Sequence, residues 1–108
     1  MSQAFVQSPE YRVTGEDRRT YSLSNEFRWK VVINGKVYGF FVNHTQASAA
    51  AGHINRQQVQ KYWDRKREDG IRVLNRDREL CALVLYEELA EELKAVLRDA
   101  RNDIDVHP

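Results

Sequence analysis

An Asn-Gly dipeptide at positions 34 and 35 separates two runs rich in apolar residues, and it constrains the fold more than any other feature. Both residue types accept the positive φ angles of a type I′ turn, and a two-residue turn fixes the register of its flanking strands. Residues 27–33 and 36–42 should therefore form an antiparallel hairpin. The expected register pairs Ile33 with Lys36, Val31 with Tyr38, Trp29 with Phe40 and Phe27 with Val42.

This register predicts which side chains share a face of the hairpin, because successive side chains of a strand point to opposite faces. The predicted core face carries Phe27, Trp29, Val31, Ile33, Tyr38, Phe40 and Val42. The other face is mixed, and carries Arg28, Lys30, Val32, Val37, Gly39 and Phe41. Aromatic pairs across the two strands should stabilise the hairpin.

The sequence before the hairpin gives weaker indications. Residues 1–10 have the character of a flexible lead-in. Tyr11 and Val13 alternate with polar residues, as do Tyr21 and Leu23, and the turn-like cluster at residues 15–17 separates them. We therefore expect residues 11–42 to form antiparallel strands. Residues 71–74 are expected to form either one more short strand or a packed connector, which gives a sheet of three to four strands.

Residues 43–67 predict two short helices joined by a tight turn. Each helix start has an Asn that can cap it, followed three residues later by a Gln that can reach back: Asn43 with Gln46, and Asn55 with Gln58. Gly52 lies where the first helix should stop, since glycine tolerates the left-handed conformation. This arrangement predicts a helix-turn-helix, whose second helix can lie in a DNA groove.

The second predicted helix has an apolar side and a polar side. Val59, Tyr62 and Trp63 should face inward. The polar side offers side chains that can bond bases, and the helix end offers cations that can meet phosphates. The candidate nucleic-acid-binding residues are Arg56, Gln57, Gln60, Lys61, Arg65, Lys66 and Arg67. A solvated surface helix would have a similar composition, so the pattern leaves that alternative open.

Residues 79–102 predict a long C-terminal helix. Apolar side chains recur at helical spacing at Leu89, Leu93, Val96, Leu97 and Ala100. That row should cover the sheet, while the helix edge with Tyr86 and Ala90 could support a homodimer. The glutamates at positions 87, 88, 91 and 92 either keep the helix solvated or bind a basic protein partner.

Charge and composition narrow the function classes. The net charge is +1, but residues 1–78 hold 14 Lys and Arg against 8 Asp and Glu, whereas residues 79–108 hold 3 against 8. This asymmetry is compatible with an anionic ligand on the first part. A single cysteine, no secretory signal and no membrane-length apolar run predict a cytoplasmic protein that does not contact the membrane.

The sequence offers little for catalysis. Cys81 lies in an apolar stretch, and His44, His53 and His107 are not spaced as metal ligands. No glycine-rich phosphate loop or serine elbow is present. We therefore expect a protein that is not an enzyme and that needs no metal or cofactor.

Residues 29–74 resemble the small modular DNA-binding repeats attached to homing endonucleases. The matching positions are Ile33-Asn34-Gly35-Lys36, Phe40 and Phe41, Ser48-Ala49, Ile54-Asn55 and Val59. Where that family has Gly before the apolar residue of the turn, this chain has His53, with Gly52 one position earlier. The resemblance implies that the second helix contacts DNA through residues 56–61.

Together these features predict one α+β domain with an antiparallel sheet, a helix-turn-helix-like pair and a long C-terminal helix. The expected function is a small non-enzymatic protein that binds duplex DNA, by analogy a regulator of a phage or mobile element. The alternative is a protein-binding module or phage-type inhibitor that contacts another protein through the acidic helix or exposed aromatics.

Overall fold

The computed structural model describes residues 9–57 and 66–98. Its elements in chain order are β1 (Glu10–Arg12), α1 (Gly15–Tyr21), β2 (Trp29–Ile33), β3 (Lys36–Phe41), α2 (His44–Gln57), β4 (Lys66–Leu74), β5 (Leu80–Tyr86) and α3 (Glu87–Leu97). The strands form one antiparallel sheet in the order β1-β2-β3-β5-β4. The α+β class is confirmed, but the sheet has five strands rather than three or four.

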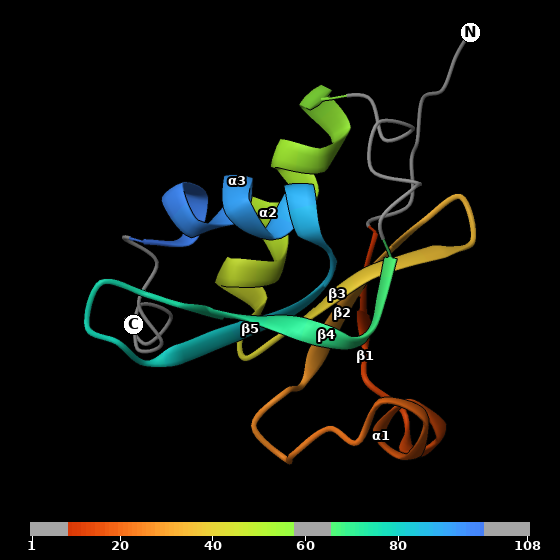
Figure 1. Ribbon diagram of the computed structural model, residues 1–108. Helices are drawn as coiled ribbons and strands as arrows, with labels where there is room; N and C mark the ends of the chain where they lie inside the picture. The colour runs from red at the N-terminus through yellow and green to blue at the C-terminus, as the bar shows by residue number, and fades with distance from the viewer. Residues whose placement is uncertain (1–8, 58–65, 99–108) are drawn as a thin grey trace, which may run out of the picture.

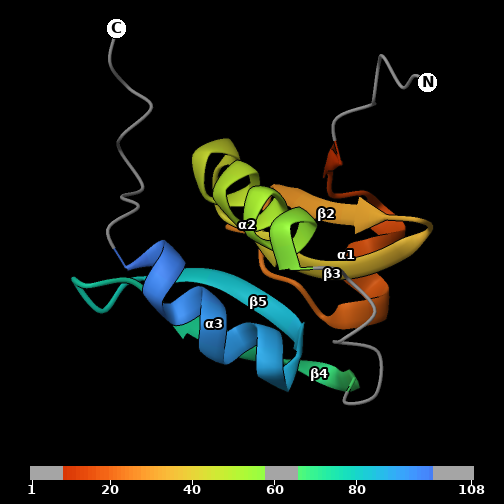
Figure 2. The same cartoon turned by 90° about the horizontal axis from the view of Figure 1, so that it is seen from above.

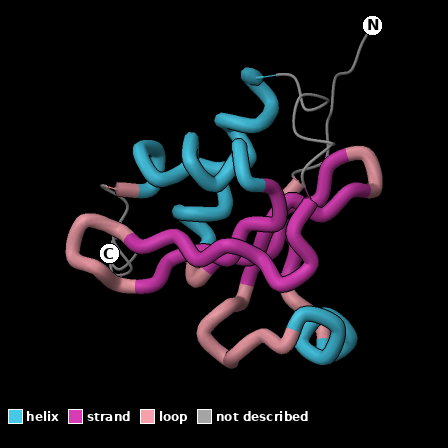
Figure 3. Tube along the Cα trace, viewed as in Figure 1, coloured by secondary structure: helices cyan, strands magenta, loops and turns pink. Residues whose placement is uncertain are grey.

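Helices lie on both sides of this sheet. Figures 1 and 2 show α2 and α3 side by side on one face, with α2 over β2 and β3 and α3 over β5. Helix α1 lies on the opposite side, and Figure 3 shows the strands between the two groups of helices. The largest fully buried apolar side chains are Tyr38, Phe40, Phe41, Ile54, Leu85, Leu89, Leu93, Leu97, Val31 and Val73.

The Asn-Gly turn of the β2–β3 hairpin is confirmed. Asn34 has φ 56° and Gly35 has φ 76°, and Ile33 lies opposite Lys36. Beyond Val32 the expected register is wrong, because the pairing shifts by one residue between Val31 and Val32.

After this shift, Val31 lies opposite Gly39 and Trp29 opposite Phe41, and the predicted partners Tyr38 and Phe40 are replaced. Phe27 and Val42 lie outside the two strands. The predicted register assumed that apolar and polar side chains alternate along each strand, with one face of the hairpin exposed. Strand β3 is instead an inner strand of the sheet, and all four residues 38–41 are buried. A bulge accommodates the extra buried residue by locally changing the twist.

The second N-terminal strand expected around Tyr21 and Leu23 is wrong, because residues 15–21 form α1. Thr14 caps this helix in a reciprocal box: its hydroxyl accepts from the Asp17 N–H at 3.1 Å, and the Asp17 carboxylate accepts from the Thr14 N–H at 2.9 Å. The Lys30 ammonium, 2.7 Å from the Asp17 carboxylate, ties α1 to β2. Burial alone would raise the pKa of Asp17, but hydrogen bonds from Lys30 and Thr14 hold that pKa below its ordinary value.

The turn predicted at Gly52 is also wrong, because α2 continues through it to Gln57. An apolar stripe spaced at helical intervals (Ala47, Ala50, Ala51 and Ile54) is buried on both sides of that glycine. A glycine inside a helix costs about 1 kcal/mol, whereas burying the isoleucine alone contributes about 1.5–3 kcal/mol. The packing therefore outweighs the stop signal. Residues 58–65, which hold most of the predicted second helix, lie outside the described residues.

The long C-terminal helix is wrong in its first half. Leu80–Tyr86 is the inner strand β5, and α3 begins only at Glu87. A short continuous apolar run does not distinguish a buried helix from a strand covered on both faces, and this run is such a strand. The helical row is confirmed where it is described, since Leu89, Leu93 and Leu97 are buried. Residues 99–102 lie outside the described residues.

Candidate nucleic-acid interface

The predicted DNA-binding residues do not lie on one helix. Arg56 and Gln57 end α2, and Arg56 is exposed. Lys66 and Arg67 begin strand β4 rather than ending a helix, and Lys66 lies opposite Tyr86 of β5. Arg67 lies 2.7 Å from the Glu87 carboxylate, so its charge already has a partner in the chain. Gln60, Lys61 and Arg65 lie outside the described residues.

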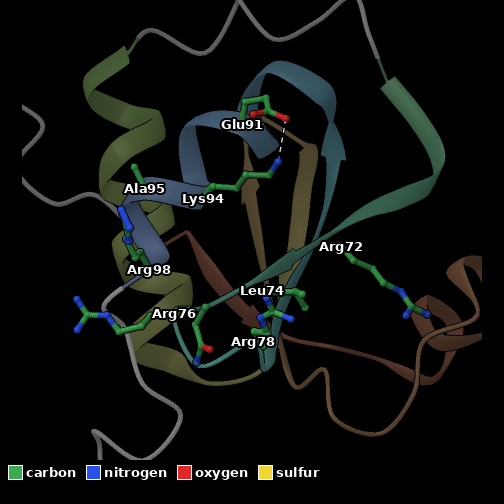
Figure 4. Close-up of a pocket in the computed structure, with 9 residues that line it drawn as sticks. Arg72, Leu74, Arg76, Arg78, Glu91, Lys94, Ala95 and Arg98 are labelled. Atoms are coloured by element: carbon green, nitrogen blue, oxygen red, sulfur yellow. Dashed lines mark hydrogen bonds and ion pairs between the residues drawn. The ribbon is translucent and has the colours of Figure 1, made fainter.

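A different group of cations comes together where β4 ends. Arg76 and Arg78 lie in the turn between β4 and β5, and Lys94 and Arg98 lie at the end of α3. We call these four exposed residues the basic surface. They line an open cavity of about 740 Å³, together with Leu74, Ala95 and Glu91. Arg72 also borders the cavity, but its side chain extends away from the others (Figure 4).

The buried side chain of Asn75 organises the turn that carries Arg76 and Arg78. Its oxygen accepts hydrogen bonds from the Asp77 N–H at 2.9 Å and the Glu79 N–H at 3.0 Å. Its nitrogen donates to the Glu79 carboxylate at 3.2 Å. Asparagine commonly bonds neighbouring backbone groups in this way. Within the same turn, Arg78 takes a left-handed conformation with φ 67°. The two arginines are thus held on a defined backbone.

Helix α3 brings the other two cations to the turn. The Arg76 N–H donates to the Arg98 carbonyl oxygen at 3.1 Å, which joins the turn to the helix end. Positive side chains at this position also complement the negative end of the helix dipole. Among the described residues that line the cavity, Glu91 is the acidic one, and its carboxylate lies 3.0 Å from the Lys94 ammonium (Figure 4). The described residues that line the cavity therefore include more cations than carboxylates.

The acidic face of α3 is largely engaged within the chain. Glu92 lies 2.7 Å from the ring nitrogen Nε2 of His53, an ion pair when that histidine is protonated, and Glu87 and Glu91 pair with Arg67 and Lys94. The edge expected to support a homodimer is buried inside the monomer, because Tyr86 and Ala90 are only 2% and 1% exposed. That dimer surface is therefore wrong. Both results leave less of α3 for a protein partner.

Aromatic exposure in the described residues is modest. Tyr11 is 41% exposed, while Trp29 is half-buried between the Arg12 guanidinium, 5.0 Å from its ring centroid, and the His44 ring at 4.6 Å. These two contacts engage the Trp29 ring within the chain.

The titratable groups considered for chemistry lie apart. Burial raises the pKa of Cys81 to about 11, with a smaller contribution from Glu79, and its thiol donates to the Val73 carbonyl oxygen at 3.4 Å. A thiol in that environment is a poor nucleophile. His44 and His53 contact different carboxylates, those of Glu10 and Glu92. Within residues 9–57 and 66–98, no three His, Cys, Asp or Glu side chains gather as metal ligands would.

Sequence reasoning missed the basic surface because it assigned residues 79–102 to one helix. That assignment separated Arg76 and Arg78 from Lys94 and Arg98, which a strand reversal brings together. The indication was present: a polar tetrapeptide between two apolar runs is typical of a hairpin turn.

Among the described helices, none combines the length and apolar character that crossing a membrane requires.

Comparison with known proteins found no matching family model, no matching curated protein and no matching solved structure. The resemblance of residues 29–74 to homing-endonuclease repeats therefore stays a prediction.

Proposed function

We propose that this chain is a small non-enzymatic protein that binds duplex DNA, with the basic surface as its phosphate-contacting site. The observation that carries the proposal is the convergence of Arg76, Arg78, Lys94 and Arg98 from two separate elements on one open cavity. Electrostatic contact with phosphates supplies most of the affinity of non-specific DNA binding and a large share of specific binding.

The form of the surface suits an extended polyanion better than a small enclosed ligand. The cavity is broad and its four cations are exposed, so several phosphates along a backbone could be met at once. Arginine can also bond phosphate or guanine through two parallel hydrogen bonds. A hairpin turn held by Asn75 loses little conformational freedom on binding, which favours affinity.

The residues predicted from the sequence to contact DNA remain part of this proposal. Arg56 and Gln57 lie at the end of α2, and Gln60, Lys61 and Arg65 follow in the segment outside the described residues.

A two-stranded β-ribbon can occupy the major groove of DNA as a helix does. The β4–β5 turn therefore offers an alternative way of contacting the groove.

A binding assay over a range of salt concentrations tests the proposal. Fluorescence anisotropy with pooled random duplexes should give an association constant whose logarithm falls linearly with the logarithm of salt. The double variant R76Q/R78Q should weaken binding and reduce the magnitude of that slope by about 2, one for each lost phosphate contact. The matched control R19Q/R28Q removes two exposed charges elsewhere and should leave the slope unchanged.

Two results would contradict the proposal. One is the absence of binding by the full chain at low salt. The other is an equal loss of affinity in R76Q/R78Q and in R19Q/R28Q, which would mean that net charge rather than the basic surface governs association.

The alternative function, a module that binds another protein through acidic α3, has less support. Glu87, Glu91 and Glu92 already lie within ion-pair distance of cations or a histidine of this chain. A basic partner would have to displace those contacts. Light scattering with and without DNA would show whether assembly accompanies either function.

A further inference from the structure

Leu74, the last residue of strand β4, is a large apolar side chain that the fold leaves in contact with solvent. It is 48% exposed, while Val73 before it is fully buried and Leu80 opposite it packs against the core. Strand β4 is an edge of the sheet, and edge strands commonly carry charged side chains at their outward positions, as the exposed Arg72 illustrates. A leucine at position 74 departs from that pattern and is accessible to a ligand.

The pairing of β4 with β5 fixes the place of this leucine. Val73 lies opposite Ala82, whereas Leu74 lies opposite Leu80, so one extra residue of β5 fits between the two pairs. A bulge of this kind changes the direction in which neighbouring side chains point. The turn organised by Asn75 follows at once, so the backbone on both sides of Leu74 is held by the fold.

Leu74 lies among the cations of the basic surface. It lines the same open cavity of about 740 Å³ as Arg78, Lys94 and Arg98, and Ala95 is a second apolar residue of that lining. Figure 4 shows Leu74 next to Arg78 at the end of β4, with Lys94 and Arg98 on α3. The surface therefore combines groups that suit phosphate with an apolar contact area.

Duplex DNA presents one apolar group at the edges of its bases. In the major groove the base pairs offer hydrogen-bond donors and acceptors, and thymine adds its 5-methyl group. The minor groove offers donors and acceptors alone, so an apolar side chain there would have to insert between stacked bases. The major groove also admits a two-stranded β-ribbon. A leucine held among phosphate-binding cations at the end of a hairpin therefore suits a thymine methyl group.

We propose that Leu74 contacts the 5-methyl group of thymine in the major groove, while Arg78, Lys94 and Arg98 contact the flanking phosphates. This inference rests on the proposed DNA-binding function and adds a base preference to it. Phosphate contacts carry no sequence information directly, whereas contacts to base edges do. Leu74 is thus a specificity-determining residue, and the chain prefers duplexes that have thymine at the contacted position.

Replacing thymine by uracil tests this contact, because the change removes the 5-methyl group and keeps every phosphate. The full chain is first used to select preferred duplexes from a random pool, and each thymine of a selected site is then replaced in turn. At the contacted position, fluorescence anisotropy should show an affinity about threefold to fivefold lower, as expected for one buried methyl group. Uracil at the remaining positions should leave the affinity unchanged.

The variants Leu74→Ala and Leu74→Asn should lose the difference in affinity between thymine and uracil. Both keep every cation, so the dependence of affinity on salt should stay as in the original chain. Tyr11→Ala is the matched control, since Tyr11 is the other exposed large apolar side chain among the described residues and lies on β1, at the opposite edge of the sheet. It should keep the thymine preference. Thermal unfolding checks that each variant folds, and either Leu74 variant suffices for the comparison.

Three results would overturn the thymine contact. The first is a selected site in which no thymine can be distinguished from uracil. The second is a thymine preference that persists in the folded Leu74 variants, and the third is an equal loss of that preference in Tyr11→Ala. A weaker affinity of Leu74→Ala without any effect of uracil belongs to the first case and would indicate insertion between bases instead.

The same measurements separate this inference from the proposed function. If the full chain binds duplexes with the expected salt dependence but does not distinguish thymine from uracil, only the contact by Leu74 is overturned. If the full chain binds no duplex at low salt, the proposed function is overturned and the contact with it.

Discussion

The two hairpin turns of the sheet lie on opposite sides of the molecule and are built on different principles (Figures 1 and 2). Asn34 and Gly35 close the β2–β3 turn through backbone conformation, with both φ angles positive. The β4–β5 turn instead closes around the side chain of Asn75, which makes three hydrogen bonds. One turn depends on residues that tolerate a strained backbone, and the other depends on one buried polar group.

This difference shows what each turn can present to a ligand. A two-residue turn has little room for side chains, and its flanking residue Lys36 borders a cavity that Lys66 and Tyr86 also line. In the longer β4–β5 turn, the Asn75 side chain bonds two backbone N–H groups. The same turn places Arg76 and Arg78 in the basic surface.

Asn75→Ala should give the largest loss of stability among changes in the two turns. It removes three hydrogen bonds and leaves the Asp77 and Glu79 N–H groups without their acceptor. At about 1 kcal/mol for each bond, the free energy of unfolding should fall by about 2–3 kcal/mol. Urea denaturation would measure it. DNA affinity should fall as well, because the two arginines lose their fixed backbone.

Ser24→Ala serves as the control, since Ser24 is an exposed polar residue whose backbone carbonyl, which the substitution keeps, accepts a hydrogen bond from Arg18. A change of under about 0.5 kcal/mol is expected there. An equally small effect of Asn75→Ala would mean that the turn is held by the strands alone.

Gly35→Ala should have a smaller effect on the opposite turn. A Cβ atom there would meet no other atom within 4 Å, so the cost comes only from the backbone at φ 76°. For an alanine in the left-handed region that cost is about 1–2 kcal/mol. Gly15→Ala is the matched control, because its Cβ would meet only an Arg19 side-chain atom at 3.7 Å and its φ is not positive. The control should be neutral or slightly stabilising in urea denaturation.

The comparison of turns also explains how much the sequence could predict. The conformation of Asn34-Gly35 depends on these two residues alone, because both residue types accept positive φ angles. The sequence therefore predicted it correctly. The β3 register was not, because it depends on burial of both faces of that strand, which only the complete sheet provides. Gly52 was misassigned for a similar reason: packing of Ile54 overrides a local stop signal.

The candidate sites were still harder to predict. The basic surface requires that Leu80–Tyr86 be a strand, since only then does α3 return Arg98 to the turn at Arg76. Apolar content alone cannot distinguish that strand from a helix. Lys36 of β3 and Lys66 of β4 likewise line one cavity, and no local pattern indicates that they meet.

Arg78→Gly should have the smallest effect on stability and a clear effect on function. Arginine at φ 67° bears left-handed strain of about 1–2 kcal/mol, which glycine relieves. Glycine also loses more chain entropy on folding, by about 0.5–1 kcal/mol, so the two effects nearly cancel. The free energy of unfolding should therefore change by less than about 1 kcal/mol. DNA affinity should decrease, and the salt slope should lose about one unit.

Arg78→Ala separates the two effects of that change. Alanine keeps the left-handed strain and removes the guanidinium, so it should lower DNA affinity as much as glycine does without relieving the strain. A turn that needed only its backbone, like the one at Asn34 and Gly35, would accept glycine at this position as well as arginine. Arginine here is consistent with a side chain that acts on a ligand. Unchanged DNA affinity in both variants, with stability raised only by glycine, would remove Arg78 from the basic surface and restrict the proposed contact to Arg76, Lys94 and Arg98.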